Sequence, residues 1–482
     1  MKKQNIYQNR SQELYALFEN AGNNSKVMCI PVDYAKKHHL AMFCNGYGDI
    51  IRKPFPVKNS PEGLNYLVDQ VKRSCSHRNI QLQHVFFGGE DISSYSESFI
   101  HSLRSMGWLV ASVNAHEAKK QRENLQASTD RLDLMGIATM LISHRANTCP
   151  AQSGIYKNLR TIVRHRKKLV KIKTEVKNRI HALVDQLFPG FLDETRSGIM
   201  PFSKSSLYLM SDRFSTRQIK RRKCQSLTKK LNRFGTKNPD KTATKLQSYA
   251  ANAFSAPKPH MHTLQLSLSC HVKHYCCLVE NIEYLEKETA LILSQTQGAF
   301  LTSIKGIGII LAAGICSEIG DPFIQKSATN LSSYAGVVPR VKQSGGPDSG
   351  PRTGSVSKRN NHILKDYLVQ ASNHIGRHGP EDLNQDFKRR KCQGQNAEFG
   401  MARRLMRITM CMMKTWQIYL PDNLRTERAD KKDRACYYLS IWPYITKKWS
   451  KLTALDKVFA KEQPLGQWRD VVQKIYKVNL DL

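Results

Sequence analysis

The sequence predicts a mixed α/β region on the N-terminal side, then a long helical pair, then a mainly helical C-terminal region. Between residues 26 and 115, short apolar runs alternate with turns and with polar helical stretches. From residue 158 onward, apolar residues recur every seven positions, which is typical of a long amphipathic helix with a partner. The chain has 482 residues, enough for about two to four domains with a sizeable core.

Five strands are predicted in the N-terminal region. The first three are separated by short turns and are expected to form an antiparallel meander, over residues 27–33, 39–45 and 50–57. A helix over residues 61–75 precedes a strand over 84–90, and another helix precedes the last strand, over 108–114. This order predicts a mixed sheet covered by helices on both faces.

A long amphipathic helix is predicted next, over residues 158–187. Its apolar positions at heptad spacing are Ile162, Leu169, Val176 and Leu183, and a neighbouring row continues with Ile180 and Leu187. A matching stripe lies downstream, at Leu278, Ile282, Leu285, Thr289 and Ile292. We therefore expect an antiparallel helical pair. The stretch between the two helices, about residues 190–265, reads as basic and loop-rich.

The chain is strongly basic, with 75 Lys and Arg residues against 39 Asp and Glu, a formal net charge of +36. Such an excess favours a polyanionic partner, because each neutralised phosphate releases counterions. The longest apolar runs are interrupted and fall short of the roughly 20 residues that span a membrane. The N-terminal residues contain no apolar core typical of a secretory signal. Nucleic acid is therefore the favoured partner, and no membrane is expected.

Two basic stretches are candidate nucleic-acid contacts rather than merely solvated charge. The predicted contacts in the long helix are Arg164, Arg166, Lys167, Lys168 and Lys171. In the basic stretch between the helices, they are Arg221 and Arg222.

The 12 cysteines show no repeating spacing and read as reduced thiols of a cytosolic protein. One cluster, at residues 270–277, combines cysteines and histidines. Adjacent Cys276 and Cys277 would point in different directions on a helix, whereas a zinc site needs converging ligands. We expect half-buried helix residues here and no zinc.

Residues 304–364 carry the strongest local signal. A turn formed by Gly306, Ile307 and Gly308 leads into an apolar helix, an arrangement like that of a helix-hairpin-helix motif. The free N–H groups of a helix start bind anions, and glycine allows close backbone approach. The turn is therefore expected to hold phosphates of a nucleic-acid backbone.

A Gly- and Ser-rich loop follows, with Ser344 placed before two glycines. Its hydroxyl is a candidate nucleophile for a phosphodiester. Judged by local chemistry alone, Ser344 is the more typical turn residue, because Gln-Ser-Gly-Gly is a favourable turn sequence. The basic residues around the loop, which would anchor the strand or neutralise charge, are Arg340, Lys342, Arg352, Lys358 and Arg359.

Four acids stand out in this basic chain. Asp33 ends the first predicted strand and Glu90 ends the fourth, while Asp130 and Asp133 share one face of a predicted helix. Converging carboxylates are what Mg²⁺ needs, and two ions roughly 4 Å apart can clamp the oxygens of a phosphoryl transfer. The arrangement suits an RNase H-like nuclease sheet. Each acid alone is more often a cap or turn residue, and Asp130 as a helix cap is the plain alternative.

The chain resembles a DEDD transposase of the insertion-sequence group that includes the Piv-type DNA invertases, the bridge-RNA-guided recombinases. Asp33, Glu90, Asp130 and Asp133 match, in order, the four acids that name the family, and the TDRLD string is typical of it. KNRIHALVDQLFP resembles the family's linker, and IKGIGIILAAGICSEIGD with LSSYAGVVPR and SGG resembles its C-terminal domain. The resemblance covers roughly residues 26–415.

This resemblance implies a domain order. It comprises an N-terminal tail (1–25), a RuvC-like, RNase H-like DEDD domain (26–146), and a coiled-coil linker with a basic insertion (147–300). Next comes a mainly α-helical transposase domain with the catalytic serine (301–418). The last part is an extension without an assigned role (419–482).

The resemblance also implies a mechanism. Ser344 matches the family's catalytic serine, which attacks a DNA phosphate, and the four acids would hold Mg²⁺, with a two-ion site allowed. Acids of a neighbouring subunit would complete the serine site in a homo-oligomer, a dimer or a tetramer. Donor and target DNA would be paired with a structured guide RNA, in the cytoplasm of a bacterium or archaeon, at the nucleoid.

Two departures from the family pattern leave alternatives open. The chain reads GGEDISSY around Glu90, where the family commonly has Thr-Gly after the glutamate, so Asp91 is an alternative ligand. Near Ser344, three other serines compete for the nucleophile's role, Ser349, Ser355 and Ser357. The alternative functions are a metal-dependent junction endonuclease that uses water, and a non-catalytic nucleic-acid-binding protein.

Overall fold

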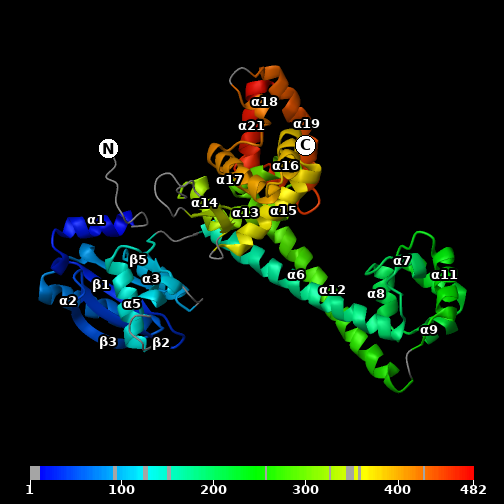
Figure 1. The fold of residues 1–482 in the computed structure, drawn as a ribbon, viewed down its shortest axis with the longest axis horizontal. Coiled ribbons are helices and arrows are strands. Elements are labelled where there is room, and N and C mark those ends of the chain that lie inside the picture. The colour runs from blue at the N-terminus through cyan, green and yellow to red at the C-terminus, as the bar shows by residue number, and fades with distance from the viewer. Residues whose placement is uncertain are drawn as a thin grey trace. The chain divides into compact units, whose positions relative to one another are not determined.

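The computed structural model describes residues 11–90, 95–122, 129–148, 154–255, 258–324, 327–342, 352–356, 360–426 and 429–482. The chain divides into two compact units, Met1–Ala151 and Gln152–Leu482. In the part of the chain that the structure describes, the first unit contains a sheet with helices, and the second contains many helices and one two-stranded sheet (Figure 1). Among the described residues, no helix has both the length and the apolar composition needed to cross a membrane.

The first unit is built on a five-stranded mixed sheet in the order β3-β2-β1-β4-β5. The strands are β1 (Met28–Asp33), β2 (His38–Asn45), β3 (Ile50–Lys58), β4 (Val85–Glu90) and β5 (Leu109–Val113). Strands β1, β2 and β3 form the predicted antiparallel meander, and β4 and β5 continue the sheet in parallel with β1. This topology is compatible with an RNase H-like fold.

Helices cover both faces of this sheet because alternate strand residues are apolar on both sides. Cys29 and Phe86 pack toward one face, with α1 (Gln12–Ala21) and α5 (Asp130–Ile142). Ile30 and Phe87 pack toward the other face, with α2 (Pro61–Arg78) and α3 (Glu97–Ser105). Helix α4 (Ala115–Arg122) follows β5.

The second unit begins with two long helices, α6 (Gly154–Leu187) and α12 (Lys258–Ser294), which lie side by side (Figure 1). The pair is antiparallel, as predicted. Tyr156 near the start of α6 hydrogen-bonds Gln297 just beyond α12, whereas Arg166, ten residues later, pairs with Glu286 inside α12.

The buried stripe of α6 differs from the predicted heptad row. Of that row only Val176 is buried, whereas Ile180 and Leu187 of the neighbouring row are buried together with Val184. Near its start α6 buries a third set, Tyr156, Leu159 and Val163, in another core. A straight α-helix drifts by about 20° per heptad, so a strict seven-residue row does not stay on one face over its length.

The basic stretch between α6 and α12 is helical, which corrects the expectation of a loop-rich segment. It forms α7 (Glu194–Ser197), α8 (Lys204–Ser211), α9 (Thr216–Arg221), α10 (Cys224–Arg233) and α11 (Pro239–Asn252). These short helices pack on the ends of α6 and α12 around one apolar core. Helices this short depend on tertiary packing, so their apolar pattern is weak in the sequence. We call residues 188–255 the tip.

A second core holds the C-terminal elements together. It contains η4 (Gln297–Ser303), α13 (Ile309–Ile319), α14 (Ala328–Tyr334), α15 (His362–His378), α16 (Glu381–Cys392) and α17 (Ala397–Thr415). The segment beyond residue 420 also belongs to this unit, as α18 (Asp422–Arg425), α19 (Lys431–Trp449), α20 (Leu455–Val458) and α21 (Pro464–Tyr476). This C-terminal segment contributes Trp442, Trp449 and Trp468 to the core. Strands β6 (Pro339–Lys342) and β7 (Arg352–Val356) form the small sheet.

Candidate metal centre and nucleic-acid interface

Strand pairing brings two of the predicted acids to one edge of the sheet. In the parallel pair β1–β4, Val32 lies opposite Gly89, so Asp33 and Glu90 are the next residues of two adjacent strands. Parallel neighbours end at the same edge, which is why acids far apart in the chain share it. Glu90 is 8% exposed and Asp33 is half-buried.

Helix α5 supplies the other two acids from its first turn. Thr129 is the N-cap, and its hydroxyl oxygen accepts a hydrogen bond from the Leu132 N–H at 3.4 Å. Thr129 is therefore the N-cap of α5, and the alternative that Asp130 is the cap is wrong. Leu134, Ile137 and Leu141 fix the helix on the sheet.

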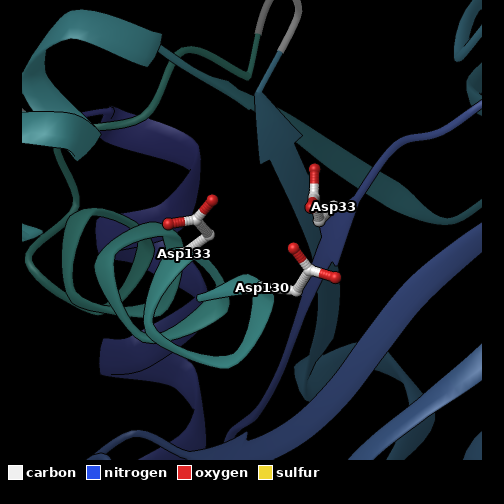
Figure 2. Close-up of side chains that lie close together, drawn as sticks. All are labelled: Asp33, Asp130 and Asp133. Atoms are coloured by element: carbon white, nitrogen blue, oxygen red, sulfur yellow. The ribbon is translucent and has the colours of Figure 1, made fainter. Parts of the chain in front are cut away.

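Asp33, Asp130 and Asp133 form one group, each with a carboxylate oxygen within 4.8 Å of those of the other two (Figure 2). Figure 2 shows the two aspartates of α5 beside Asp33 at the end of β1. Three carboxylates from two elements are the oxygen donor set that Mg²⁺ prefers, so these residues fit a divalent cation. Glu90 is not part of this group, and Asp91 lies outside the described residues.

Gly89 permits this edge to close. A Cβ atom there would lie 2.2 Å from the Val32 carbonyl oxygen and 2.4 Å from the Tyr34 ring. Because these atoms flank Asp33 in the chain, any side chain at position 89 would push the end of β1 aside. The glycine is thus required by the close approach of the strand that carries the first acid.

The serine loop is described only at its two ends. In the antiparallel register of the two strands, Lys342 at the end of β6 lies opposite Arg352 at the start of β7. Arg340 on β6 and Ser355 on β7 are exposed. The remaining candidates of this loop lie outside the described residues, namely Ser344, Ser349, Ser357, Lys358 and Arg359.

The glycine turn before α13 adopts a conformation that favours glycine. Gly306 has φ +93°, and a Cβ atom there would lie 3.2 Å from the His374 backbone. Gly308 is the N-cap of α13 and makes no side-chain capping bond. The predicted turn into an apolar helix is therefore present.

Two residues of α19 hold this turn, and the sequence reasoning missed both. The Tyr444 hydroxyl accepts a hydrogen bond from the Gly306 N–H at 3.2 Å. The Lys448 ammonium donates to the carbonyl oxygens of Thr302, Ile304 and Ile307 at 2.6, 3.1 and 2.5 Å. Burial lowers the pKa of Lys448 to about 7. No sequence signal separates Lys448 from the exposed Lys447 and Lys451 beside it, since only the fold shows which lysine faces the turn.

The predicted basic contacts divide into paired and exposed residues. Lys168, Lys171 and Arg221 are exposed. The others form ion pairs within the second unit: Arg164 with Glu318, Arg166 with Glu286, Lys167 with Asp366, and Arg222 with Asp212.

Two family models match the chain. Residues 30–189 match the IS110-type DEDD model described as "Transposase", and residues 298–387 match the model described as "Transposase IS116/IS110/IS902 family". The first match includes the three clustered aspartates and Glu90. The second includes the glycine turn and the serine loop.

Curated relatives agree with these matches. The chain is 33% identical over 101 residues to the transposase for insertion sequence element IS1328 of Yersinia enterocolitica, covering 21% of this chain and 29% of the relative. It is 23% identical over 282 residues to the insertion element IS116 uncharacterized 44.8 kDa protein of Streptomyces clavuligerus, covering 56% and 67%. The chain thus matches less than a third of the length of the first relative.

Proposed function

Because the chain belongs to the IS110/IS116 family of DEDD transposases, we propose that it is a DNA transposase that cleaves and rejoins DNA. The observation that carries the proposal is the convergence of Asp33, Asp130 and Asp133 within 4.8 Å. These acids come from a strand end and a helix start that lie 97 or more positions apart in the chain, and packing of the fold does not require their carboxylates to be close together. Binding of a divalent cation would explain why they converge.

In the proposed site Asp33, Asp130 and Asp133 would hold Mg²⁺, and Glu90 at the end of the adjacent strand would be the fourth ligand. Bound Mg²⁺ would supply positive charge that favours loss of the nucleophile's proton and stabilises charge on the phosphate oxygens. The role of the four acids is to hold that charge at the sheet edge. The half-buried position of Asp33 keeps it partly away from water.

We assign the nucleophile to Ser344, whose family match outweighs its local turn chemistry. Its oxygen would form a bond to a DNA phosphorus while a phosphorus–oxygen bond of the strand breaks, leaving a free hydroxyl on the released end. The serine proton passes to a base or to water, since a neutral hydroxyl is a weak nucleophile. Attack by a DNA hydroxyl on the serine ester would then rejoin the strands and restore Ser344.

The basic residues would hold the strands during this exchange. Phosphates would lie against the turn at Gly306 and Gly308 and against Arg340, Lys342, Arg352, Lys358 and Arg359. Lys168, Lys171 and Arg221 offer exposed charge for longer contacts. We further propose a homo-oligomer that brings donor and target DNA together, with a structured guide RNA, in the cytoplasm at the nucleoid.

A hydrolytic nuclease is the second candidate, because the clustered aspartates all belong to the first unit and need no serine to act on water. The two functions predict different products. The transposase forms a covalent protein–DNA ester, whereas the nuclease releases free ends only.

The test is to incubate the protein with Mg²⁺, labelled donor and target DNA, and the RNA transcribed from DNA flanking the gene, and then to denature it. A labelled band at the mass of protein plus DNA, absent in Ser344→Ala and retained in Ser355→Ala, is the expected result. Cleavage that survives Ser344→Ala without a covalent band would establish the nuclease instead. Binding without strand breakage would reduce the protein to a nucleic-acid-binding role.

A further inference from the structure

Apart from its first two residues, the tip lies outside both segments that match the family models, and it has a composition of its own. Between residues 188 and 255 it contains 14 lysine and arginine residues against four aspartate and glutamate residues. Its core is independent of the C-terminal core, with fully buried Phe188, Phe191, Phe214 and Leu246. It is therefore a small basic module placed at the ends of α6 and α12.

A groove of about 490 Å³ opens in this module between α8, the end of α10 and α12. Tyr208 and Phe234 lie on one side, their rings stacked at 4.6 Å between centroids and 30° between planes. Helix α12 contributes Val272, Cys276 and Cys277 to the lining. The lining is mostly apolar, so the groove suits a flat apolar face better than a phosphate alone.

Cations surround this apolar lining. Lys204 of α8 and Lys273 of α12 line the groove and are exposed, and the Lys230 ammonium lies 5.4 Å from the centroid of the Tyr208 ring. Glu280 is the single acid among the lining residues. Tyr208 interacts with both Lys230 and Phe234, so the half-buried Phe234 ring is the aromatic lining residue on which we expect a base to stack.

We propose that this groove binds unpaired nucleotides of single-stranded nucleic acid. A base would stack on Phe234, and the flanking phosphates would contact Lys204 and Lys273. Aromatic rings within a basic groove are the common means of binding single strands, because every base has a stacking face. A duplex would leave the rings unused, since its bases are already stacked and paired.

An acidic peptide is the competing occupant for such a groove. The charge balance of the whole tip favours nucleic acid, because the basic excess extends far beyond the groove along α9 and α10, as a phosphate chain requires. The proposal does not rest on strand transfer. Single-strand binding is measured without Mg²⁺, so its outcome does not depend on the proposed metal site.

Binding of fluorescein-labelled 15-nucleotide poly(dT), poly(U) and a duplex of equal length to the full-length protein tests the proposal. Phe234→Leu and the pair Lys204→Glu with Lys273→Glu are each expected to weaken single-strand binding about tenfold. The matched control is Lys457→Glu with Lys461→Glu, which reverses two exposed lysines of the C-terminal segment. Preference for poly(U) or for poly(dT) tells RNA from DNA as the source of the strand.

Alkylation of Cys277 by iodoacetamide provides a second readout that does not depend on a variant folding. Cys277 is exposed and lines the groove, and the exposed Cys436 on α19 is the internal reference. The single strand should slow modification of Cys277 severalfold and leave Cys436 unchanged. Equal modification with and without the strand, or equal binding by wild type and both groove variants, overturns the proposal. Protection by the duplex alone overturns it as well.

Discussion

The Asp33, Asp130 and Asp133 carboxylates illustrate how single residues define this site. Like charges within 4.8 Å repel one another, and the repulsion is stronger where water is partly excluded, as at half-buried Asp33 and Asp133. Their folded arrangement therefore favours a bound cation, which would offset this repulsion. Binding and folding are then coupled, because the unfolded chain does not hold the three groups together.

We predict that Mg²⁺ stabilises the wild-type protein and not Asp130→Asn. A ligand at a hundred times its Kd contributes about 2.7 kcal/mol, which corresponds to a rise of several degrees in Tm for a domain of this size. Differential scanning fluorimetry with and without Mg²⁺ measures the shift. Asp69→Asn changes an exposed acid on α2 and should respond to Mg²⁺ like wild type. An equal Mg²⁺ shift in Asp130→Asn would contradict the metal site.

At the scale of elements, ion pairs inside the second unit join helices that are far apart in the chain. Glu318 near the end of α13 has a fully buried side chain and pairs with Arg160 and Arg164 of α6. It also accepts a hydrogen bond from the Asn361 side chain at 2.7 Å, and Asn361 caps α15. One carboxylate therefore ties three helices together.

Glu318→Gln should destabilise the second unit by about 1 to 3 kcal/mol at pH 7, because the half-buried Arg160 and Arg164 lose the counter-charge of the buried carboxylate. Burial alone would raise the pKa of Glu318. Hydrogen bonds from Arg164 and Asn361, with the charges of Arg160 and Arg164, outweigh burial and hold the pKa below its ordinary value.

Because the folded-state pKa is the lower one, this stabilisation is complete above the unfolded pKa of about 4.3. It is lost as the pH falls through the folded-state pKa. Urea unfolding followed by tryptophan fluorescence at pH 7 and at decreasing acidic pH should therefore show the difference between variant and wild type shrinking. Glu283→Gln, on the exposed side of α12, should differ from wild type by less than about 0.5 kcal/mol at every pH.

The hydrogen bonds between α19 and the glycine turn give a second prediction at the scale of elements. Lys448→Met keeps the length of the side chain but removes the donor for three carbonyl groups, which should cost about 2 kcal/mol or more. We expect a Tm lower by several degrees and weaker duplex binding. Lys447→Met removes a neighbouring exposed charge and should keep the wild-type Tm. Identical melting of the two variants would show that the turn does not depend on Lys448.

At the scale of the whole molecule, the net charge of +36 would dominate the proposed binding of nucleic acid. Affinity that comes from phosphate contacts falls steeply with salt, because counterions released on binding are harder to release into concentrated salt. Ion pairs such as Arg166 with Glu286 remove part of this charge from the exposed set. The remaining excess still greatly favours a polyanion.

Duplex affinity should therefore fall by about 10³- to 10⁵-fold between 50 and 200 mM KCl, as for proteins with roughly six to ten phosphate contacts. Fluorescence anisotropy across that range gives the slope of log Kd against log salt. A nearly flat slope would mean that the basic surface does not contact the phosphates. If Arg221 binds a phosphate, Arg221→Ala should reduce the slope of log Kd against log salt by about one.

Local pattern was enough to predict most elements of the chain. The apolar runs ending in Asp33 and Glu90 are strands, and Asp130 and Asp133 begin a helix. These elements were predictable because the periodicity of a strand or a helix is visible within a short stretch of sequence. The antiparallel partner of α6 was also readable, since both stripes lie on long helices. The order of acids, strands and glycine turn further indicated the family.

The tertiary structure alone decided which of these residues meet. It places three of the four predicted acids in one group and leaves Glu90 outside it, moves the buried stripe of α6 off the heptad row, and folds the basic stretch into helices. It also selects Lys448 from a run of similar lysines to hold the turn at Gly306. Such outcomes depend on contacts between residues distant in the chain, and no local periodicity records those contacts.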